Sequence, residues 1–251
     1  MKQDEIRQYV EKNIQTFHDA RLKSLSALKL TRVLKKKNPY LFKAKNIVTP
    51  RDLVKAILDA YLSSQEEAIL GNFLEGLAVF ICSRTYGGRK STSEGIDLEF
   101  EKNGTLYVVS IKSGPNWGNS SQIKAMRANF KSAIKRYRQN KQFGKIEAVN
   151  GCCYGRQQSK SESKGDYTKL CGQRFWEFIS GNSNLYTEII EPLGHQAKER
   201  NELFQSQYEV VVDSFTQEFR QDFCSTNNQI LWKKFTQFTS GEQSPKLTPA
   251  K

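Results

Sequence analysis

The sequence is poor in the residues that build metal clusters and disulfide frameworks. Its 251 residues include two histidines and five cysteines, and no cysteines are spaced as Cys-x-x-Cys. A structural zinc site needs such pairs or nearby histidines, so we expect none. A sparse, odd set of cysteines is typical of reduced thiols in a cytoplasm. We therefore expect Cys152 and Cys153 to pack as buried thiols.

A long hydrophobic run is also missing. The most apolar stretch, residues 68–82, contains Asn72 and Glu75 and is too short and too polar to cross a bilayer. No apolar run follows the polar residues 1–5, so we expect no signal peptide. The expectation is a cytoplasmic protein with no membrane partner.

Positive charge is abundant. Lysine and arginine number 39 against 26 acidic residues, which gives a net charge of +13. The 37% hydrophobic and 11% aromatic residues suffice for a core and exclude a wholly disordered chain. The excess of positive charge favours a polyanionic partner, nucleic acid before an acidic membrane surface.

Local signals predict helices around a short sheet. Thr49 and Pro50 begin one helix, and a capping box from Ser64 to Glu67 begins another that runs to about residue 84. The other predicted segments are helices at 1–34, 119–140, 173–179, 196–224 and 229–238, and strands at 96–101, 105–112 and 146–154. This order predicts an α/β fold, a mixed sheet with helices on its faces. The predicted ranges are an N-terminal helical region at 1–62, a core with a helical C-terminal part at 63–239 and a flexible tail at 240–251, within one domain overall.

The first two predicted strands form a hairpin that carries candidate catalytic side chains. Asn103-Gly104 is a strong two-residue turn signal, and it pairs Lys102 with Thr105. Alternation then places Ile96, Leu98 and Phe100 on one face and Asp97, Glu99 and Glu101 on the other. The same register puts Asp97 opposite Ser110, with Cβ atoms roughly 5 Å apart, and Lys112 within about 7–8 Å of Asp97.

A carboxylate, a nearby oxygen and a lysine suit attack on a phosphodiester. Mg²⁺ prefers oxygen ligands and can polarise a phosphoryl oxygen. A lysine beside it can orient water and stabilise negative charge. The alternative is a solvated hairpin on which Asp97 and Lys112 form a surface pair.

Three neighbouring features favour the functional interpretation. Glu75 lies in a stripe with Gly71, Ala78 and Cys82 on a buried helix, where a lone carboxylate needs a partner, although an exposed helix edge or a structural salt bridge is the alternative. Residues 112–122, rich in glycine, hydroxyls and amides, lead into a helix N-terminus, as phosphate-binding loops do, or form an ordinary loop. The following residues 119–145 contain eight basic side chains and no acid, so they form a nucleic-acid face or a solvated one.

The sequence resembles the PD-(D/E)XK nucleases at these positions. Asp97 is followed thirteen residues later by Ser110-Ile111-Lys112, and residues 95–98, 111–116 and 172–181 look like those of type II restriction endonucleases of that superfamily. The resemblance covers about residues 65–195. It implies a restriction-endonuclease-like core, a short mixed sheet flanked by helices with an N-terminal helical extension. It also implies Mg²⁺-dependent hydrolysis of double-stranded DNA by a homodimer, alongside a cognate methyltransferase.

The resemblance assigns Asp97 to metal binding and Lys112 to the motif lysine. The family usually has an acid where this sequence has Ser110, so one ligand charge is missing. Glu75 is the first choice for its replacement and Glu99 the second. If neither reaches the metal, the protein is a DNA-binding module without activity; a nuclease that reads branched or damaged DNA is the other alternative.

DNA contacts are predicted on the loop, the basic helix and a polar segment. Base reading requires amide or guanidinium groups in a groove, and residues 154–164 are the best source of them, unless they are a disordered surface loop. The predicted DNA-binding residues are Ser113, Asn116, Trp117, Asn119, Ser120, Gln122, Lys124, Arg127, Lys131 and Arg156.

Overall fold

The computed structural model describes residues 3–139, 143–157 and 162–242. The chain divides into two compact units. A sheet-containing unit comprises residues 1–15 and 70–195, and a helical unit comprises residues 16–69 and 196–251. The two long N-terminal helices, α1 (Gln3–Ser26) and α4 (Pro50–Tyr86), contribute residues to both units.

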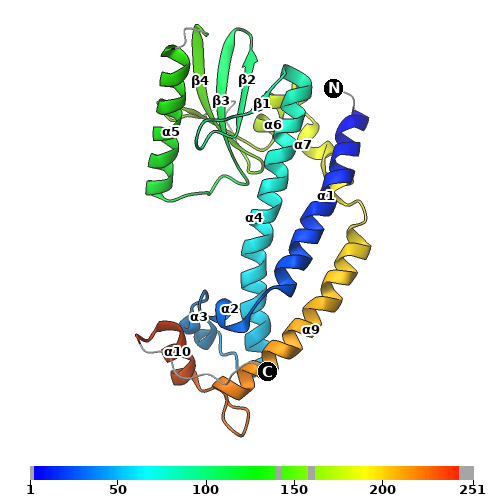
Figure 1. The fold of residues 1–251 in the computed structure, drawn as a ribbon, viewed down its shortest axis with the longest axis vertical. Helices are drawn as coiled ribbons and strands as arrows, with labels where there is room; N and C mark the ends of the chain where they lie inside the picture. The colour runs from blue at the N-terminus through cyan, green and yellow to red at the C-terminus, as the bar shows by residue number, and fades with distance from the viewer. Residues whose placement is uncertain (1–2, 140–142, 158–161, 243–251) are drawn as a thin grey trace. The chain divides into compact units, whose positions relative to one another are not determined.

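The first unit is built on a mixed sheet (Figure 1). Its six strands are β1 (Arg89–Lys90), β2 (Leu98–Lys102), β3 (Thr105–Lys112), β4 (Lys145–Cys152), β5 (Glu162–Ser163) and β6 (Thr168–Cys171). They lie in the order β1-β2-β3-β4-β6-β5. The central pairs β3–β4 and β4–β6 are parallel, and the remaining pairs are antiparallel. The expected mixed sheet flanked by helices is confirmed, with short strands β1, β5 and β6 that sequence patterns did not predict.

Helices cover both faces of this sheet. On one face, α5 (Ser120–Gln139) buries Met126 and Phe130 against Leu106 and Val108. On the other, Phe100 of β2 stacks on Tyr86 at the end of α4 and meets Phe178 of α6 (Gln173–Ser180) edge-on. The short helices α7 (Leu185–Glu188) and α8 (Ile190–Leu193) follow α6.

The alternation predicted along the first strand is wrong at one position. Ile96 belongs to the cluster under α5, whereas Leu98 and Phe100 pack on the opposite face. Regular pairing begins at Leu98, and Gly95 with φ +68 precedes it, so Ile96 lies outside the extended strand. Strict alternation holds only within regular β structure.

The hairpin register is confirmed. Lys102 pairs with Thr105 and Leu98 with Val109, as the two-residue turn requires. Asn103 and Gly104 both have positive φ, 53° and 72°, which is the geometry of a type I′ turn.

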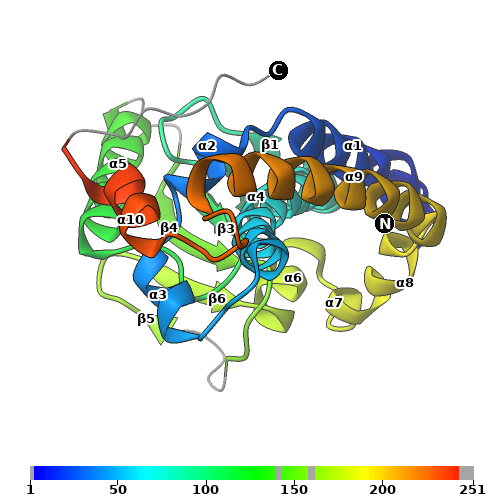
Figure 2. The ribbon, with the colours of Figure 1, turned by 90° about the horizontal axis from the view of Figure 1, so that it is seen from below.

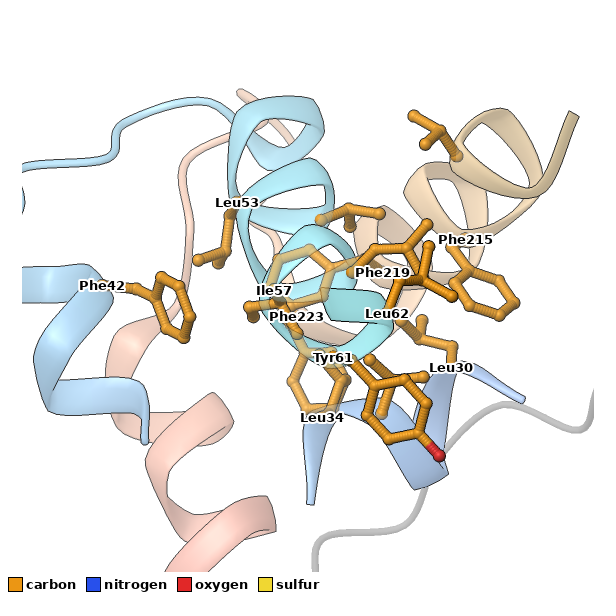
Figure 3. Close-up of a cluster of buried hydrophobic side chains, with 14 of the residues drawn as sticks. Leu30, Leu34, Phe42, Leu53, Ile57, Tyr61, Leu62, Phe215, Phe219 and Phe223 are labelled. Atoms are coloured by element: carbon orange, nitrogen blue, oxygen red, sulfur yellow. The ribbon is translucent and has the colours of Figure 1, made fainter. Parts of the chain in front are cut away.

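The helical unit has its own hydrophobic core. Besides its parts of α1 and α4, it contains α2 (Leu30–Leu34), α3 (Pro39–Ala44), α9 (Ala197–Phe223) and α10 (Trp232–Ser240). Apolar faces of these helices meet in the cluster of Figure 3. Residues labelled there include Phe42, Leu53, Ile57, Phe219 and Phe223.

Helix α4 does not break where a capping box was predicted. Thr49 caps the helix as expected, because its hydroxyl accepts the Asp52 N–H at 3.1 Å. Ser64 is not a cap: its hydroxyl donates to the Ala60 carbonyl at 3.2 Å, inside an uninterrupted helix. The apolar contacts on either side of Ser64 outweigh its local capping preference.

Within the described part of the chain, α4 is the one helix long and apolar enough to cross a membrane by length and composition. Its apolar residues, such as Leu53, Ile57 and Leu77, are buried in the protein. A core helix passes the same test.

The two units divide the chain differently from the predicted ranges. Residues 196–239, predicted as part of the core, belong to the helical unit, because Phe215 and Phe219 of α9 pack with Leu53 and Ile57 of α4. Residues 243–251, most of the predicted tail, lie outside the described residues, as do 158–161 of the polar segment predicted to read bases.

Thr49, which caps α4, and Ser64, which lies inside it, allow a matched test. Thr49→Ala removes a side-chain cap and should lower the free energy of unfolding by about 1 kcal/mol. Ser64→Ala should change it by less than about 0.5 kcal/mol, because alanine suits a helix interior. Urea unfolding followed by circular dichroism measures both. An equal loss for the two variants would restore the predicted helix start at Ser64.

Candidate nuclease site

Asp97 lies where the hairpin pairing ends. Its carboxylate oxygen Oδ2 accepts the backbone N–H of Ile111 at 2.6 Å and faces the Ser110 hydroxyl at 3.4 Å. Its own N–H donates to the Val109 carbonyl at 2.9 Å. The predicted juxtaposition of Asp97 and Ser110 is therefore present, and the carboxylate is tied to the strand that carries Lys112.

Glu75 of α4 lies in the same neighbourhood. Burial raises the pKa of the Cys153 thiol to about 12, and the negative charges of Glu75 and Asp97 both add to the rise. Glu75 is partly exposed and forms a 3.4 Å ion pair with Lys90, whose side chain is 73% exposed. The predicted buried carboxylate is thus half-buried, with an exposed and replaceable partner.

The surroundings of Asp97 disfavour the charged form of its carboxyl group. Burial raises the pKa of its carboxyl above the ordinary value, and the negative charge of Glu75 raises it further. The Ile111 N–H, the Lys112 charge and the Ser110 hydroxyl oppose the rise. A bound cation near Asp97 would offset both the burial and the negative charge of Glu75.

These residues fit Mg²⁺ by the nature of their donors. Mg²⁺ takes one or two carboxylates and keeps several waters. In the described ranges there is no cluster of three or more histidine, cysteine or acidic side chains that could hold a metal. Asp97 and Glu75 therefore suit a hydrated ion better than an all-protein cage.

Glu99 is differently occupied. It is 3% exposed, and its two oxygens receive the hydroxyls of Ser91 and Tyr137, each at 2.5 Å. Arg89 and Arg136 both lie 3.6 Å from it. The structure thus surrounds Glu99 with partners from β1, the following loop and α5, whereas Asp97 has Glu75 as its acidic neighbour.

A network of polar contacts lies next to Lys112. The Lys112 ammonium lies 5.1 Å from the ring centre of Trp117. The indole N–H of Trp117 donates to Asn150 Oδ1 at 3.0 Å, and the Asn150 amide donates to the Ser110 carbonyl at 3.2 Å. Asn150 is 1% exposed and was missed by sequence reasoning; the signal was a lone amide in the buried half of β4, between Val149 and Gly151.

The predicted phosphate-binding loop is anchored at both ends. The Tyr154 N–H donates to the Ser113 carbonyl at 3.0 Å, and the Lys169 ammonium donates to the Pro115 carbonyl at 2.9 Å. At the start of α5, Asn119 and Gln122 cap each other through reciprocal backbone–side-chain bonds of 2.9 and 3.1 Å. This rigid entry into a helix suits an anion-binding position.

The remaining predicted DNA-binding residues are on the surface. Asn116 and Ser120 are exposed, and so are Lys124, Arg127 and Lys131 of α5. Arg127 lies 3.5 Å from Asp166. Arg156 is exposed, but its neighbour Gln157 is used structurally, because its amide bonds both the carbonyl of Lys169 and the N–H of Cys171.

The two adjacent cysteines match their predicted state. Cys152 and Cys153 are free and buried. Burial raises the pKa of both thiols, so neither is a ready nucleophile.

Comparison with known proteins assigns the family. The family described as type II restriction endonuclease EcoO109I matches residues 4–201, most of the chain. The chain belongs to this family. Type II restriction endonucleases are site-specific nucleases that act on DNA and generally depend on divalent metal ions, so membership supports a restriction endonuclease. No curated protein sequence matches the chain.

The raised pKa of Asp97 predicts a stability effect that needs no catalysis. Because the folded-state pKa exceeds the unfolded one, ionising Asp97 costs stability above the folded pKa, and the cost disappears below the ordinary value near 4. Asp97→Asn keeps an acceptor for Ile111. We expect a higher urea midpoint for this variant at pH 7, with a difference that shrinks as the pH falls toward 4.

The control is Glu101→Gln, an exposed acid on the same strand, which should leave the midpoint unchanged. An Asp97→Asn variant that is less stable than the parent at pH 7 would contradict the expected cost.

Proposed function

We propose that this restriction endonuclease is a Mg²⁺-dependent enzyme that hydrolyses phosphodiester bonds at a short, specific sequence of double-stranded DNA. Water attacks phosphorus in line with the leaving 3′ oxygen, which leaves 5′-phosphate and 3′-hydroxyl ends. The observation that carries the proposal is the hairpin, which brings Asp97 against β3 two residues before Lys112, beside Glu75. Family membership supports it.

Asp97 and Glu75 would hold the metal ion. When bound, Mg²⁺ supplies positive charge beside the scissile phosphate and makes water more acidic. The two carboxylates orient the site, and the Ile111 N–H fixes Asp97 in place for this task. The negative charge of Glu75, which raises the pKa of Asp97, supports a cation position near both acids.

Lys112 would act on the attacking water and on the developing charge. Its ammonium is a donor with no acceptor function, so it can orient water and stabilise an anionic phosphorane. The contact with the Trp117 ring limits where that ammonium can go. Trp117 thus joins Asn150 as a positioning residue, in addition to its predicted place near DNA.

Glu75 takes the place of the acid missing at Ser110. The Ser110 hydroxyl bonds Asp97 rather than contributing a charge. The observation that favours Glu75 is that its charge acts on Asp97, whereas both oxygens of Glu99 are already hydrogen bonded. We therefore prefer Glu75 to Glu99 as the second ligand.

DNA would contact the loop after β3 and the exposed face of α5. Lys124, Arg127 and Lys131 suit phosphates, and Arg156 suits a base edge. The loop residues Ser113, Asn116, Trp117, Asn119, Ser120 and Gln122 complete this surface. A homodimer on a palindromic site, a cytoplasmic location and a cognate DNA methyltransferase complete the proposal.

Ser110 also supports a second candidate, a DNA-binding module without catalysis. Its test is digestion of a large defined DNA with Mg²⁺ or EDTA, beside Asp97→Ala. Discrete Mg²⁺-dependent fragments that the variant does not produce would establish the nuclease. Intact DNA together with salt-sensitive binding would establish the module.

Lys112→Ala should lower cleavage by at least about 10²-fold, the scale of a lost transition-state contact. DNA binding in EDTA should stay within a few-fold of the parent, because the phosphate contacts are elsewhere. Gel cleavage and anisotropy measure the two effects. Cleavage by the variant at the parent rate would remove Lys112 from the mechanism.

The identity of the second acid is tested by a matched pair. Glu75→Gln should abolish Mg²⁺-dependent cleavage, since it removes one of two ligand charges, and it should weaken Mg²⁺ binding measured by calorimetry. Glu99→Gln should lower stability through its lost partners while leaving Mg²⁺ affinity unchanged. The reverse result for Mg²⁺ affinity would make Glu99 the ligand.

A further inference from the structure

The helical unit contains a basic surface that the proposed nuclease site does not use. Residues 20–51 include ten lysines and arginines and no acid. Residues 223–241, which include α10, also contain no acid and add Lys233 and Lys234. The two segments are far apart in the sequence, so only the fold can bring them together.

Packing of α3 against α10 unites them. Phe42 of α3 and Phe235 of α10 enter the same core, and Figure 2 shows the two helices next to each other. The Lys43 ammonium lies 5.3 Å from the Trp232 ring centre, and that of Lys35 lies 5.2 Å from the Phe238 ring centre. Lysines of the first segment therefore surround a helix of the second.

An open groove of about 390 Å³ lies between these helices; we call it the α3–α10 groove. Tyr40, Lys43, Trp232 and Lys233 line it, and no acid does. Tyr40 is 65% exposed, which is unusual for so large an apolar ring. The groove thus combines cations with aromatic surface, as nucleic-acid contacts do.

The charges around the groove are not neutralised by the protein. Of the ten cations in residues 20–51, Arg21 forms a 2.8 Å ion pair with Glu66, and Arg51 forms a 2.7 Å ion pair with Glu209. In the part of the chain that the structure describes, Lys35, Lys43 and Lys233 have no carboxylate partner. Cations that serve only to keep a surface soluble would not need to be kept apart from carboxylates. The unpaired lysines around the groove therefore suit an anionic partner.

We propose that the α3–α10 groove binds the phosphate backbone of double-stranded DNA, in addition to the contacts of the nuclease site. Lysines that meet phosphates release condensed counterions, and this supplies affinity without sequence information. Tyr40 and Trp232 add contact to sugar and phosphate edges. The inference rests on the proposed function, which makes DNA the polyanion that the protein meets.

The test compares two double variants of the full-length chain. Lys43→Ala with Lys233→Ala removes two groove charges, and Lys23→Ala with Lys198→Ala removes two exposed charges of the same unit that do not line the groove. Lys198 lies at the opposite end of α9 from Phe223, which shares the hydrophobic core with α10. The two residues are 25 positions apart, or about 37 Å along the helix axis. Affinity for a labelled duplex without a recognition site is measured in EDTA at several salt concentrations.

The groove variant should bind roughly tenfold more weakly at physiological salt. Its plot of log affinity against log salt should be shallower by about 1.8, at about 0.9 per lost phosphate contact. The control variant should match the parent, and Lys43→Arg with Lys233→Arg should restore the parent slope. Circular dichroism and urea midpoints confirm that each variant is folded.

A parental slope in the groove variant would overturn the proposal. So would a change of sedimentation mass without a change of slope, because the groove would then bind a second copy of the chain. The slope is read without cleavage, so a chain that fails to cut DNA would contradict the nuclease function alone. A chain that cuts DNA with an unchanged slope would contradict the groove alone.

Discussion

The pairing register of the β2–β3 hairpin is the constraint on which the candidate site depends. A two-residue turn with positive φ at Asn103 and Gly104 aligns the strands so that Asp97 reaches the N–H of Ile111. Lys112 follows on the same strand at a distance that the backbone sets. A slip of one residue would turn Asp97 to the other face of the sheet and separate the two groups. The geometry of the candidate site is therefore set by the turn before it is set by the side chains.

Three carboxylates near this hairpin show how a structural acid differs from a functional one. Glu99 is buried and has hydroxyl and guanidinium partners around both oxygens. Asp97 is instead buried beside the negative charge of Glu75, which raises the pKa of the Asp97 carboxyl, and the partner of Glu75 is an exposed lysine. Local electrostatic strain of this kind concentrates at functional sites, because evolution retains it only where a ligand or a reaction relieves it.

Sequence reasoning succeeded where local signals decide the structure. The Asn103-Gly104 turn and the Thr49 cap are short-range features, and both are confirmed. It failed where tertiary packing overrides them, since Ser64 lies inside a helix whose apolar contacts continue on both sides. The two-unit division was equally hidden, because α9 joins the helical unit through contacts with a segment more than a hundred residues away. The site residues Asp97, Ser110 and Lys112 could be grouped by register alone, but the role of Asn150 depends on which strand pairs with β3.

The turn that aligns the hairpin is also its chemically weakest peptide. In an exposed Asn-Gly sequence, the glycine nitrogen can attack the asparagine amide and expel ammonia, which closes a succinimide ring. Water then opens the ring, and one of the two products is an isoaspartate with one extra methylene in the main chain. Lengthening the chain at Asn103 would alter the turn that two-residue hairpins require. Ageing at a single surface peptide would then reach the spacing of Asp97 and Lys112, although neither side chain is itself modified.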